Sequence, residues 1–191
     1  MRQKADGRTW RAAWGALALC AAGSAMAWSL EGSKQIVAVT QNAERIVIGQ
    51  VHFTPEAGDQ LGYALKLDTS RFQDHFLSMR EFKCLPAASE VSCHVPYPYA
   101  HPQRVTAQQF DWLSHELLFL YKQPRDYGAK LWNGVYYQFE RSDTGLVGRP
   151  QAVDLNLISA PPDQKDVPPY DRAAREPMPA GQRWIDHLRI E

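Results

Sequence analysis

Histidines next to carboxylates are the residues of this sequence with the widest range of possible chemistry. Asp111 and His115 are four residues apart, so in a helix they share a face and could orient one ligand or one proton. A zinc site would need three or four such groups to converge, each held in a fixed tautomer by a neighbouring group. The candidate metal ligands are His94, His101 and His115, and a His/Asp-based hydrolase would draw on the same residues together with Asp74, His75 and Asp111.

Motifs that would support catalysis are absent from the sequence. It contains no H-E-x-x-H, no G-x-S-x-G, no G-x-G-x-x-G and no G-x-x-x-x-G-K-[ST]. We therefore expect most histidines to be ordinary surface or hydrogen-bonded side chains, and we expect no cofactor. The sequence favours a protein without catalytic activity over an enzyme.

Aromatic residues near a proline-rich segment are the stronger indication of binding. Tyrosine and tryptophan combine a flat apolar face with a polar group, which suits contacts with sugars, peptides or partner proteins. Residues 95–102 contain three prolines, which cannot donate to a strand ladder, so we expect Tyr97 and Tyr99 to be exposed for recognition. The alternative is that most of these rings fill the layer between sheet and helix. The candidate binding residues are Tyr97, Tyr99, His101, Trp112 and Trp132.

Residues 1–27 have the pattern of a signal peptide. Four basic residues precede a short apolar stretch that ends in Ala25-Met26-Ala27, a typical cleavage site. The apolar core is shorter than the roughly 20 residues that a membrane-spanning helix needs. We expect a periplasmic or secreted protein. The alternative is an uncleaved anchor that holds a structural protein on the outer side of a membrane.

Removal of this leader changes the charge and cysteine content of the chain. Residues 28–191 contain 17 basic and 20 acidic side chains, and this mildly acidic balance argues against a nucleic-acid partner. Cys84 and Cys93 remain as an even pair, flanked by residues that favour strands. In an oxidising compartment, we expect them to form a disulfide across a hairpin.

The pattern of apolar residues predicts an α+β fold with about six mainly antiparallel strands and one helix packed across them. Residues 61–67 alternate between apolar and more polar side chains, which is typical of a half-buried strand. A helix is predicted to begin at a capping box, Thr106 to Gln109, and to end before Pro124. Residues 142–145 predict a hairpin with a four-residue connection. The alternative architecture is a small β-barrel with a covering helix.

The predicted organisation is a signal peptide over 1–27, a single domain over 28–160 and a Pro-rich arm over 161–191. The end of the arm, 182–190, is apolar enough to dock on the sheet. The expected function is that of an exported, non-catalytic protein that binds a ligand or associates with the cell envelope. Its expected partner is an envelope protein, a glycan or a small apolar ligand, with membrane contact only through an uncleaved N-terminus.

Overall fold

The computed structural model describes residues 28–191. The expected signal peptide, and with it the alternative of an N-terminal anchor, lies outside the described residues. Within 28–191, no helix is long and apolar enough to cross a membrane.

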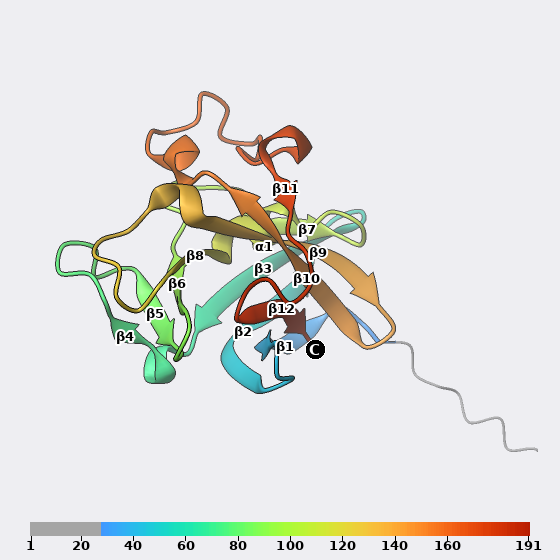
Figure 1. Ribbon diagram of the computed structural model, residues 1–191. Coiled ribbons are helices and arrows are strands. Elements are labelled where there is room, and N and C mark those ends of the chain that lie inside the picture. The colour runs from blue at the N-terminus through green and yellow to red at the C-terminus, as the bar shows by residue number, and fades with distance from the viewer. Residues whose placement is uncertain (1–27) are drawn as a thin grey trace, which may run out of the picture.

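In the described part of the chain, twelve strands form one sheet in which every pair is antiparallel (Figure 1). The order along the sheet is β4-β5-β6-β8-β9-β10-β12-β1-β2-β3-β7, and β11 pairs with β10. The strands are β1 (Gly32–Thr40), β2 (Arg45–Pro55), β3 (Gln60–Leu67), β4 (Gln73–Asp74), β5 (Lys83–Pro86), β6 (Val91–Val95), β7 (Arg104–Thr106), β8 (Leu118–Lys122), β9 (Gly134–Ser142), β10 (Gly145–Val153), β11 (Glu176–Pro177) and β12 (Ile185–Ile190). The helices are α1 (Asp111–Glu116) and four short 3₁₀ turns, η1 (Thr69–Arg71), η2 (Leu131–Asn133), η3 (Leu155–Ile158) and η4 (Arg172–Ala174).

The predicted α+β fold with about six strands is therefore wrong. Residues 28–191 are mostly sheet and contain only one short α-helix. Strands such as β4, β7 and β11 have two or three residues, which is too short to show an alternating pattern. The barrel alternative is not found either, because β4 and β7 end the described ladder without pairing with each other.

The predicted long helix is also wrong, because the chain changes from helix to strand in its middle. Thr106 Oγ1 accepts the N–H of Gln109, as the capping box predicts, but this turn precedes a helix of only six residues. The next residues form β8, a central strand between β6 and β9. Phe119 packs in one hydrophobic cluster, while Leu118 and Leu120 pack in the other. A strand buried on both faces is a continuous apolar run, which sequence periodicity does not distinguish from a buried helix.

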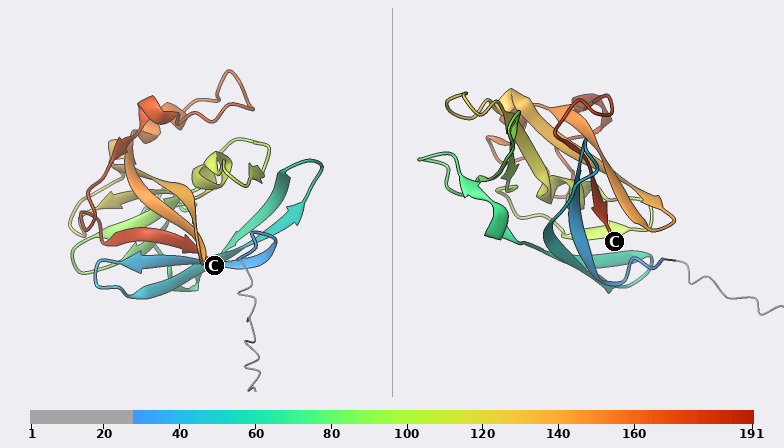
Figure 2. Two further views of the ribbon diagram at one scale, coloured as in Figure 1. Left: turned by 90° about the vertical axis from the view of Figure 1, so that its right-hand side faces the viewer. Right: turned by 60° about the horizontal axis from the view of Figure 1, so that its bottom comes forward.

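Two hydrophobic clusters lie on the two faces of this part of the sheet. The larger one lies on the face that carries Phe119 and includes Ile36, Phe53, Leu113 and Tyr137. The smaller one lies on the face that carries Leu118 and is covered by η3 and by the arm. Figure 2 shows how the sheet coils and how the arm passes over its upper end.

The turn between β9 and β10 is tighter than predicted. Ser142 pairs with Gly145, which leaves only Asp143 and Thr144 as the connection. Gly145 has a φ of 152°, and a Cβ at this position would collide with the backbone carbonyl of Ile190 in β12. Glycine is therefore required where the hairpin meets the C-terminal strand.

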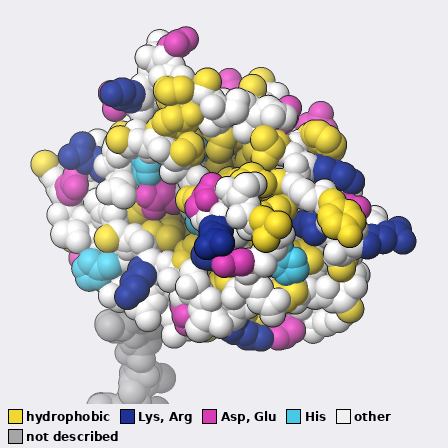
Figure 3. Space-filling view, turned by 90° about the vertical axis from the view of Figure 1, so that its left-hand side faces the viewer, with side chains coloured by type: hydrophobic (Ala, Val, Ile, Leu, Met, Phe, Trp, Pro, Cys, Tyr) yellow, Lys and Arg dark blue, Asp and Glu magenta, His cyan; other side chains and the backbone are white. Residues whose placement is uncertain are grey.

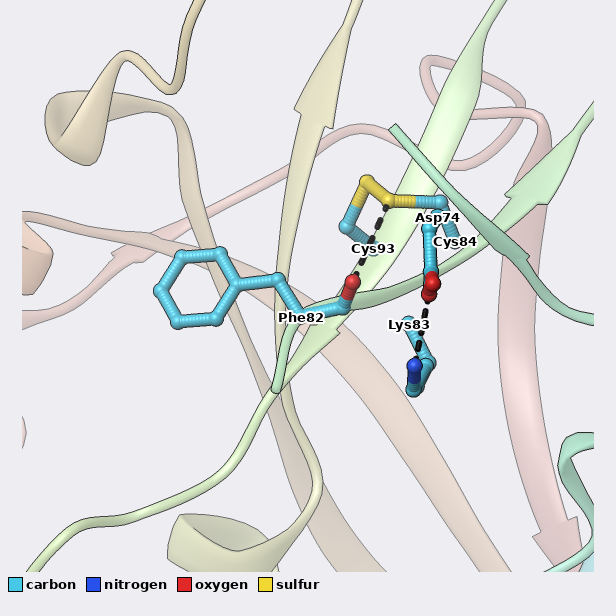
Figure 4. The surroundings of a disulfide bond; sticks show 5 residues. All are labelled: Asp74, Phe82, Lys83, Cys84 and Cys93. Atoms are coloured by element: carbon cyan, nitrogen blue, oxygen red, sulfur yellow. Dashed lines mark hydrogen bonds and ion pairs between the residues drawn. A yellow bond between two sulfur atoms is a disulfide. The ribbon is translucent and has the colours of Figure 1, made fainter. Parts of the chain in front are cut away.

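The predicted disulfide is confirmed. Cys84 in β5 and Cys93 in β6 are directly opposite each other and are bonded, and both are fully buried (Figure 4). Beside them, Lys83 Nζ lies 2.6 Å from Asp74 Oδ1, an ion pair between β5 and β4. The disulfide therefore ties β5, which follows Phe82, to β6, which precedes Pro96.

Loss of the disulfide is expected to lower the free energy of unfolding by about 2–3 kcal/mol, because the bond restricts a short loop in the unfolded chain. The measurement is urea unfolding of the double variant Cys84→Ala, Cys93→Ala against the oxidised wild type. A reductant should lower the stability of the wild type and leave the double variant unchanged. Equal stability of the oxidised wild type and the variant would contradict this expectation.

Candidate functional site

A cluster of aromatic rings surrounds His115, on the helix α1. The imidazole stacks on Tyr170 of the arm, with ring centres 5.4 Å apart. Tyr136 of β9 meets it edge-on at 5.3 Å, and Tyr97 of the proline-rich loop meets it at 5.7 Å. Trp112, one turn earlier on α1, completes the cluster at 5.4 Å. The cluster thus joins four segments that are far apart in the sequence.

Both ring nitrogens of His115 have hydrogen-bond partners. Nδ1 lies 2.7 Å from the carbonyl oxygen of Asp111 and donates to it, and Nε2 accepts the backbone N–H of Tyr170 at 3.2 Å. Burial lowers the pKa of His115 to about 4, because the charged imidazolium loses its hydration. His115 is therefore a neutral side chain that holds the arm on α1.

His101 and Glu116 form a second polar group beside this cluster. His101 Nε2 lies 2.9 Å from Glu116 Oε1, and Gln103 Nε2 donates to the same oxygen at 3.1 Å. The His101 ring stacks on Trp112 at 5.1 Å, and its side chain is only 6% exposed. These contacts fix the proline-rich loop on the end of α1 and leave little of the imidazole accessible to a substrate.

The candidate metal ligands do not form a metal site in the described part of the chain. His94 Nε2 donates to the carbonyl oxygen of Glu116 at 2.8 Å, and burial lowers the pKa of this imidazole. Within residues 28–191, no group of three or more His, Cys, Asp or Glu side chains is placed to hold a metal ion. The three histidines instead support α1 and its neighbouring segments. Asp74, another residue of the hydrolase hypothesis, is paired with Lys83.

Tyr97 and Tyr99 are half-buried, whereas the prolines around them had led us to expect exposed side chains. The prolines keep this loop out of the ladder, but the loop folds back onto the two hydrophobic clusters. Tyr97 packs between Tyr99 and Trp112. Tyr99 donates its hydroxyl hydrogen to the carbonyl oxygen of Ile158 in η3, at 3.2 Å. Of the candidate binding residues, Trp132 alone is largely exposed, on η2.

An apolar pocket of about 350 Å³ lies beside Tyr99. Its walls come from the residues before β5, the proline-rich loop, η2 and η3, with Glu81 and Ser159 as its polar side chains other than the Tyr99 hydroxyl. The apolar walls are made mainly by Phe82, Val95, Tyr99, Leu131, Leu155 and Ile158. Sequence reasoning identified only Tyr99 among them, because apolar residues from separate segments look like ordinary core residues.

A larger cavity of about 570 Å³ lies between α1, β7 and the arm, and two of the charged side chains in its wall are engaged in internal contacts. Arg104 Nε donates to Glu56 Oε2 at 2.6 Å. Asp111 Oδ1 accepts the hydroxyl hydrogen of Tyr136 at 3.1 Å. The smaller pocket is the better candidate for the binding site of an apolar ligand, because most of the residues that line it are apolar.

Comparison of the chain with protein-family models, with curated proteins and with solved structures finds no match.

Proposed function

We propose that this is an exported, non-catalytic binding protein that takes one small apolar group into the pocket beside Tyr99. The observation that carries the proposal is the pocket itself, because segments from four parts of the chain converge on one apolar hollow. Sites for small molecules are concave and lined mainly by apolar side chains, with a few polar groups, and this pocket has that composition.

The volume and lining limit the chemistry of the ligand. About 350 Å³ is at the lower end of the range for small-molecule sites, which suits a single acyl chain or ring system. The Tyr99 hydroxyl is already bonded to Ile158, so its ring offers an apolar face. Glu81 supplies an acceptor for a head group, and the Ser159 oxygen can only accept, because its hydrogen is donated to the carbonyl oxygen of Asn156 at 2.7 Å.

The disulfide supports a pocket that exists before the ligand arrives. Phe82 lies two residues before Cys84, and Val95 lies two residues after Cys93, so the bond ties two walls of the pocket together. A preformed site loses less conformational entropy when it binds.

Export is part of the same proposal. The leader-like pattern of residues 1–27 favours translocation, and the Cys84–Cys93 bond suits an oxidising compartment such as the periplasm or the extracellular space. The N-terminal residue of the protein recovered from cells tests whether cleavage follows Ala27.

Filling the pocket is expected to weaken binding of dodecanoate by at least about tenfold, equivalent to about 1.4 kcal/mol. The variant is Leu131→Trp, which places a larger side chain in the pocket wall, and the measurement is isothermal titration with dodecanoate below its micellar concentration. Leu157→Trp is the matched control, because Leu157 is exposed on η3 and does not line the pocket. Thermal unfolding checks that both variants are folded.

Two results would contradict the proposal. The first is a folded Leu131→Trp variant that binds dodecanoate as the wild type does. The second is a wild-type protein that binds neither dodecanoate nor the uncharged dodecanol.

A further inference from the structure

The larger cavity, of about 570 Å³, has a wall whose chemistry differs from that of the pocket beside Tyr99. It lies where the arm passes over α1 and the edge strand β7 (Figures 1 and 2). Trp112, two prolines and a valine make its apolar part, and its polar wall residues are Gln60, Arg104, Thr106, Gln109, Asp111 and Asp166. The volume is within the range of small-molecule sites, and the wall is mostly polar.

Three hydrogen-bonding side chains in this wall have no partner within residues 28–191. They are the amides of Gln60 and Gln109 and the indole N–H of Trp112. Gln60 begins β3 and Gln109 precedes α1, and both side chains are exposed. Each amide has an acceptor oxygen and two N–H donors, so the two amides can both donate to a ligand and accept from it.

The indole of Trp112 is mostly buried, which makes its unpaired N–H more informative than the exposed amides. Trp112 is only 8% exposed, and His101 stacks on its ring. The N–H is not sealed off, because the hydroxyl of Tyr63 is the only fully buried side-chain polar atom without a partner in residues 28–191. A buried tryptophan usually has a partner for this N–H, and a ligand in the cavity would supply the missing acceptor.

The charges of the wall favour a neutral ligand. Arg104 Nε donates to Glu56 Oε2 at 2.6 Å, so this cation is already paired. Asp111 and Asp166 have no ion-pair partner among residues 28–191. An anionic ligand would therefore meet two carboxylates, and a cationic ligand would meet the guanidinium group in the same wall.

Charged residues next to the wall do not change this balance. Arg175 lies over the ring of Tyr136, 4.6 Å from its centre, and the hydroxyl of this tyrosine donates to Asp111. Asp163 and Lys165 of the arm are exposed and carry opposite charges. Acidic and basic side chains are also interspersed on the face of the molecule in Figure 3. A ligand of either charge thus gains no general attraction from these surfaces.

We propose that this cavity binds a neutral sugar, held by its amides, its carboxylates and the indole N–H. A sugar presents hydroxyl groups around a ring whose C–H groups are apolar, and the wall offers acceptors, donors and apolar surface together. The carboxylates can accept hydroxyl hydrogens, while the amides and the indole can donate to hydroxyl oxygens. The site is separate from the pocket beside Tyr99, because the two share no wall residue.

A sugar fits this cavity better than a peptide does. A common way for a peptide to bind beside a sheet is to add a strand to its edge. The edge strand β7 has three residues, and the N–H of Thr106 is already bonded to the carbonyl oxygen of Gln109 at 3.1 Å. Little of this edge is left for a peptide backbone, whereas a sugar needs only the side-chain groups.

Isothermal titration with the neutral trisaccharides maltotriose, cellotriose and triacetylchitotriose tests the proposal. The wild type is expected to bind at least one of them. The double variant Gln60→Ala, Gln109→Ala is expected to weaken this binding at least about tenfold, because hydrogen-bonding groups are lost from the wall. The matched control is Gln50→Ala, Gln73→Ala, which changes exposed glutamines of β2 and β4 outside the cavity and should leave binding unchanged.

Three results of this titration would overturn the sugar site. The first is a wild type that binds none of the trisaccharides at millimolar concentration. The second is a folded Gln60→Ala, Gln109→Ala variant that binds the sugar as the wild type does, with folding checked by thermal unfolding. The third is binding of an uncharged glycine–serine hexapeptide in place of the sugars.

The indole N–H gives a readout within the site itself. Its NMR signal in Trp112, assigned by its absence from Trp112→Phe, is expected to shift when the sugar is added. The corresponding signal of Trp132, which is exposed on η2 and does not line the cavity, should stay in place. A sugar that shifts the Trp132 signal and leaves that of Trp112 unchanged would contradict the assignment.

A charge variant tests the preference for a neutral ligand. Oxidation of the primary hydroxyls of the bound sugar to carboxylates is expected to weaken binding severalfold, because Asp111 and Asp166 line the cavity. Asp166→Asn should reduce this difference, since it removes an exposed carboxylate that has no ion-pair partner among residues 28–191. Tighter binding of the oxidised sugar by the wild type would contradict the expected preference.

The sugar site and the pocket beside Tyr99 are tested separately. The Gln60→Ala, Gln109→Ala variant should bind dodecanoate as the wild type does, and Leu131→Trp should bind the sugar as the wild type does. Loss of sugar binding in a folded Leu131→Trp variant would overturn the placement of the sugar in the larger cavity. A wild type that binds the sugar but neither dodecanoate nor dodecanol would refute the apolar site and support the sugar site alone.

Discussion

Replacing Tyr170 by alanine is expected to lower the free energy of unfolding by about 3–5 kcal/mol, the range for removal of a large buried ring. Tyr170 is fully buried although it lies in the Pro-rich arm. Its ring stacks on His115, and its hydroxyl donates to the carbonyl oxygen of Asp154 at 3.0 Å. The substitution would leave a cavity between the arm and the sheet, next to η3.

Two further variants separate the contributions of the ring and the hydroxyl. Tyr170→Phe keeps the ring and should cost about 1 kcal/mol, the typical net value of one hydrogen bond. Val167→Ala, in the same arm at an exposed position, should have almost no effect. Urea unfolding measures all three variants. A Tyr170→Ala variant as stable as Val167→Ala would show that the arm adds nothing to the stability of the body.

Acidification is expected to destabilise the protein through His115, by about 3 kcal/mol between pH 7 and pH 4. Burial is the largest cause of its lowered pKa of about 4, and nearby Arg175 and His101 lower it further, whereas the Asp111 carbonyl and carboxylate act in the opposite direction. The unfolded chain has an ordinary histidine pKa of about 6.5 and binds the proton more readily. The contribution is therefore complete above about pH 6.5 and is lost as the pH falls toward about 4.

Protonation of His115 destabilises the folded state because the imidazole loses its hydrogen-bond acceptor, Nε2. Protonated His115 cannot accept the N–H of Tyr170, and its charge would lie near Arg175 of the arm. Burial lowers the pKa of His94, which adds to the acid sensitivity, whereas burial raises the pKa of Glu90 and offsets part of it.

The test compares unfolding free energies from pH 7 to pH 4 for the wild type, His115→Gln and His52→Gln. His115→Gln is less stable at pH 7 but should lose much less stability over this range, because glutamine does not titrate. His52 is exposed on β2, and its variant should follow the wild type. Parallel pH profiles for the wild type and His115→Gln would contradict the role assigned to His115.

The sequence predicted local features well where a single pattern was sufficient. Cys84 and Cys93 lie between residues that favour strands, and this spacing predicted the bonded hairpin. The alternation over residues 61–67 predicted a strand, which the structure shows as β3. The prediction of a long helix was wrong because residues 118–122 carry apolar side chains on both faces. Only their position between β6 and β9 makes them a strand.

The candidate site was predictable only in part. Tyr97, His101, Trp112 and His115 are close together, as a loop next to a helix allows. The polar atoms of His101 and His115 hold the loop and the arm in place, and the rings of Tyr97 and Trp112 pack against them. The pocket required Leu131 and Ile158, and nothing in their local sequence distinguishes them from other apolar residues.

Composition and neighbours along the chain are sufficient for three features: the leader-like pattern of residues 1–27, the balance of 17 basic and 20 acidic side chains over residues 28–191, and the pairing of Cys84 with Cys93. The tertiary structure decided the strand order, the place of β12 between β10 and β1, and the convergence of the loop, η2 and η3 on one pocket. These features depend on contacts between residues that are far apart in the sequence, and periodicity within one segment contains no information about its partner. The same physical reason separates the half-buried Tyr99 from the exposed Tyr127, since only packing decides which ring is covered.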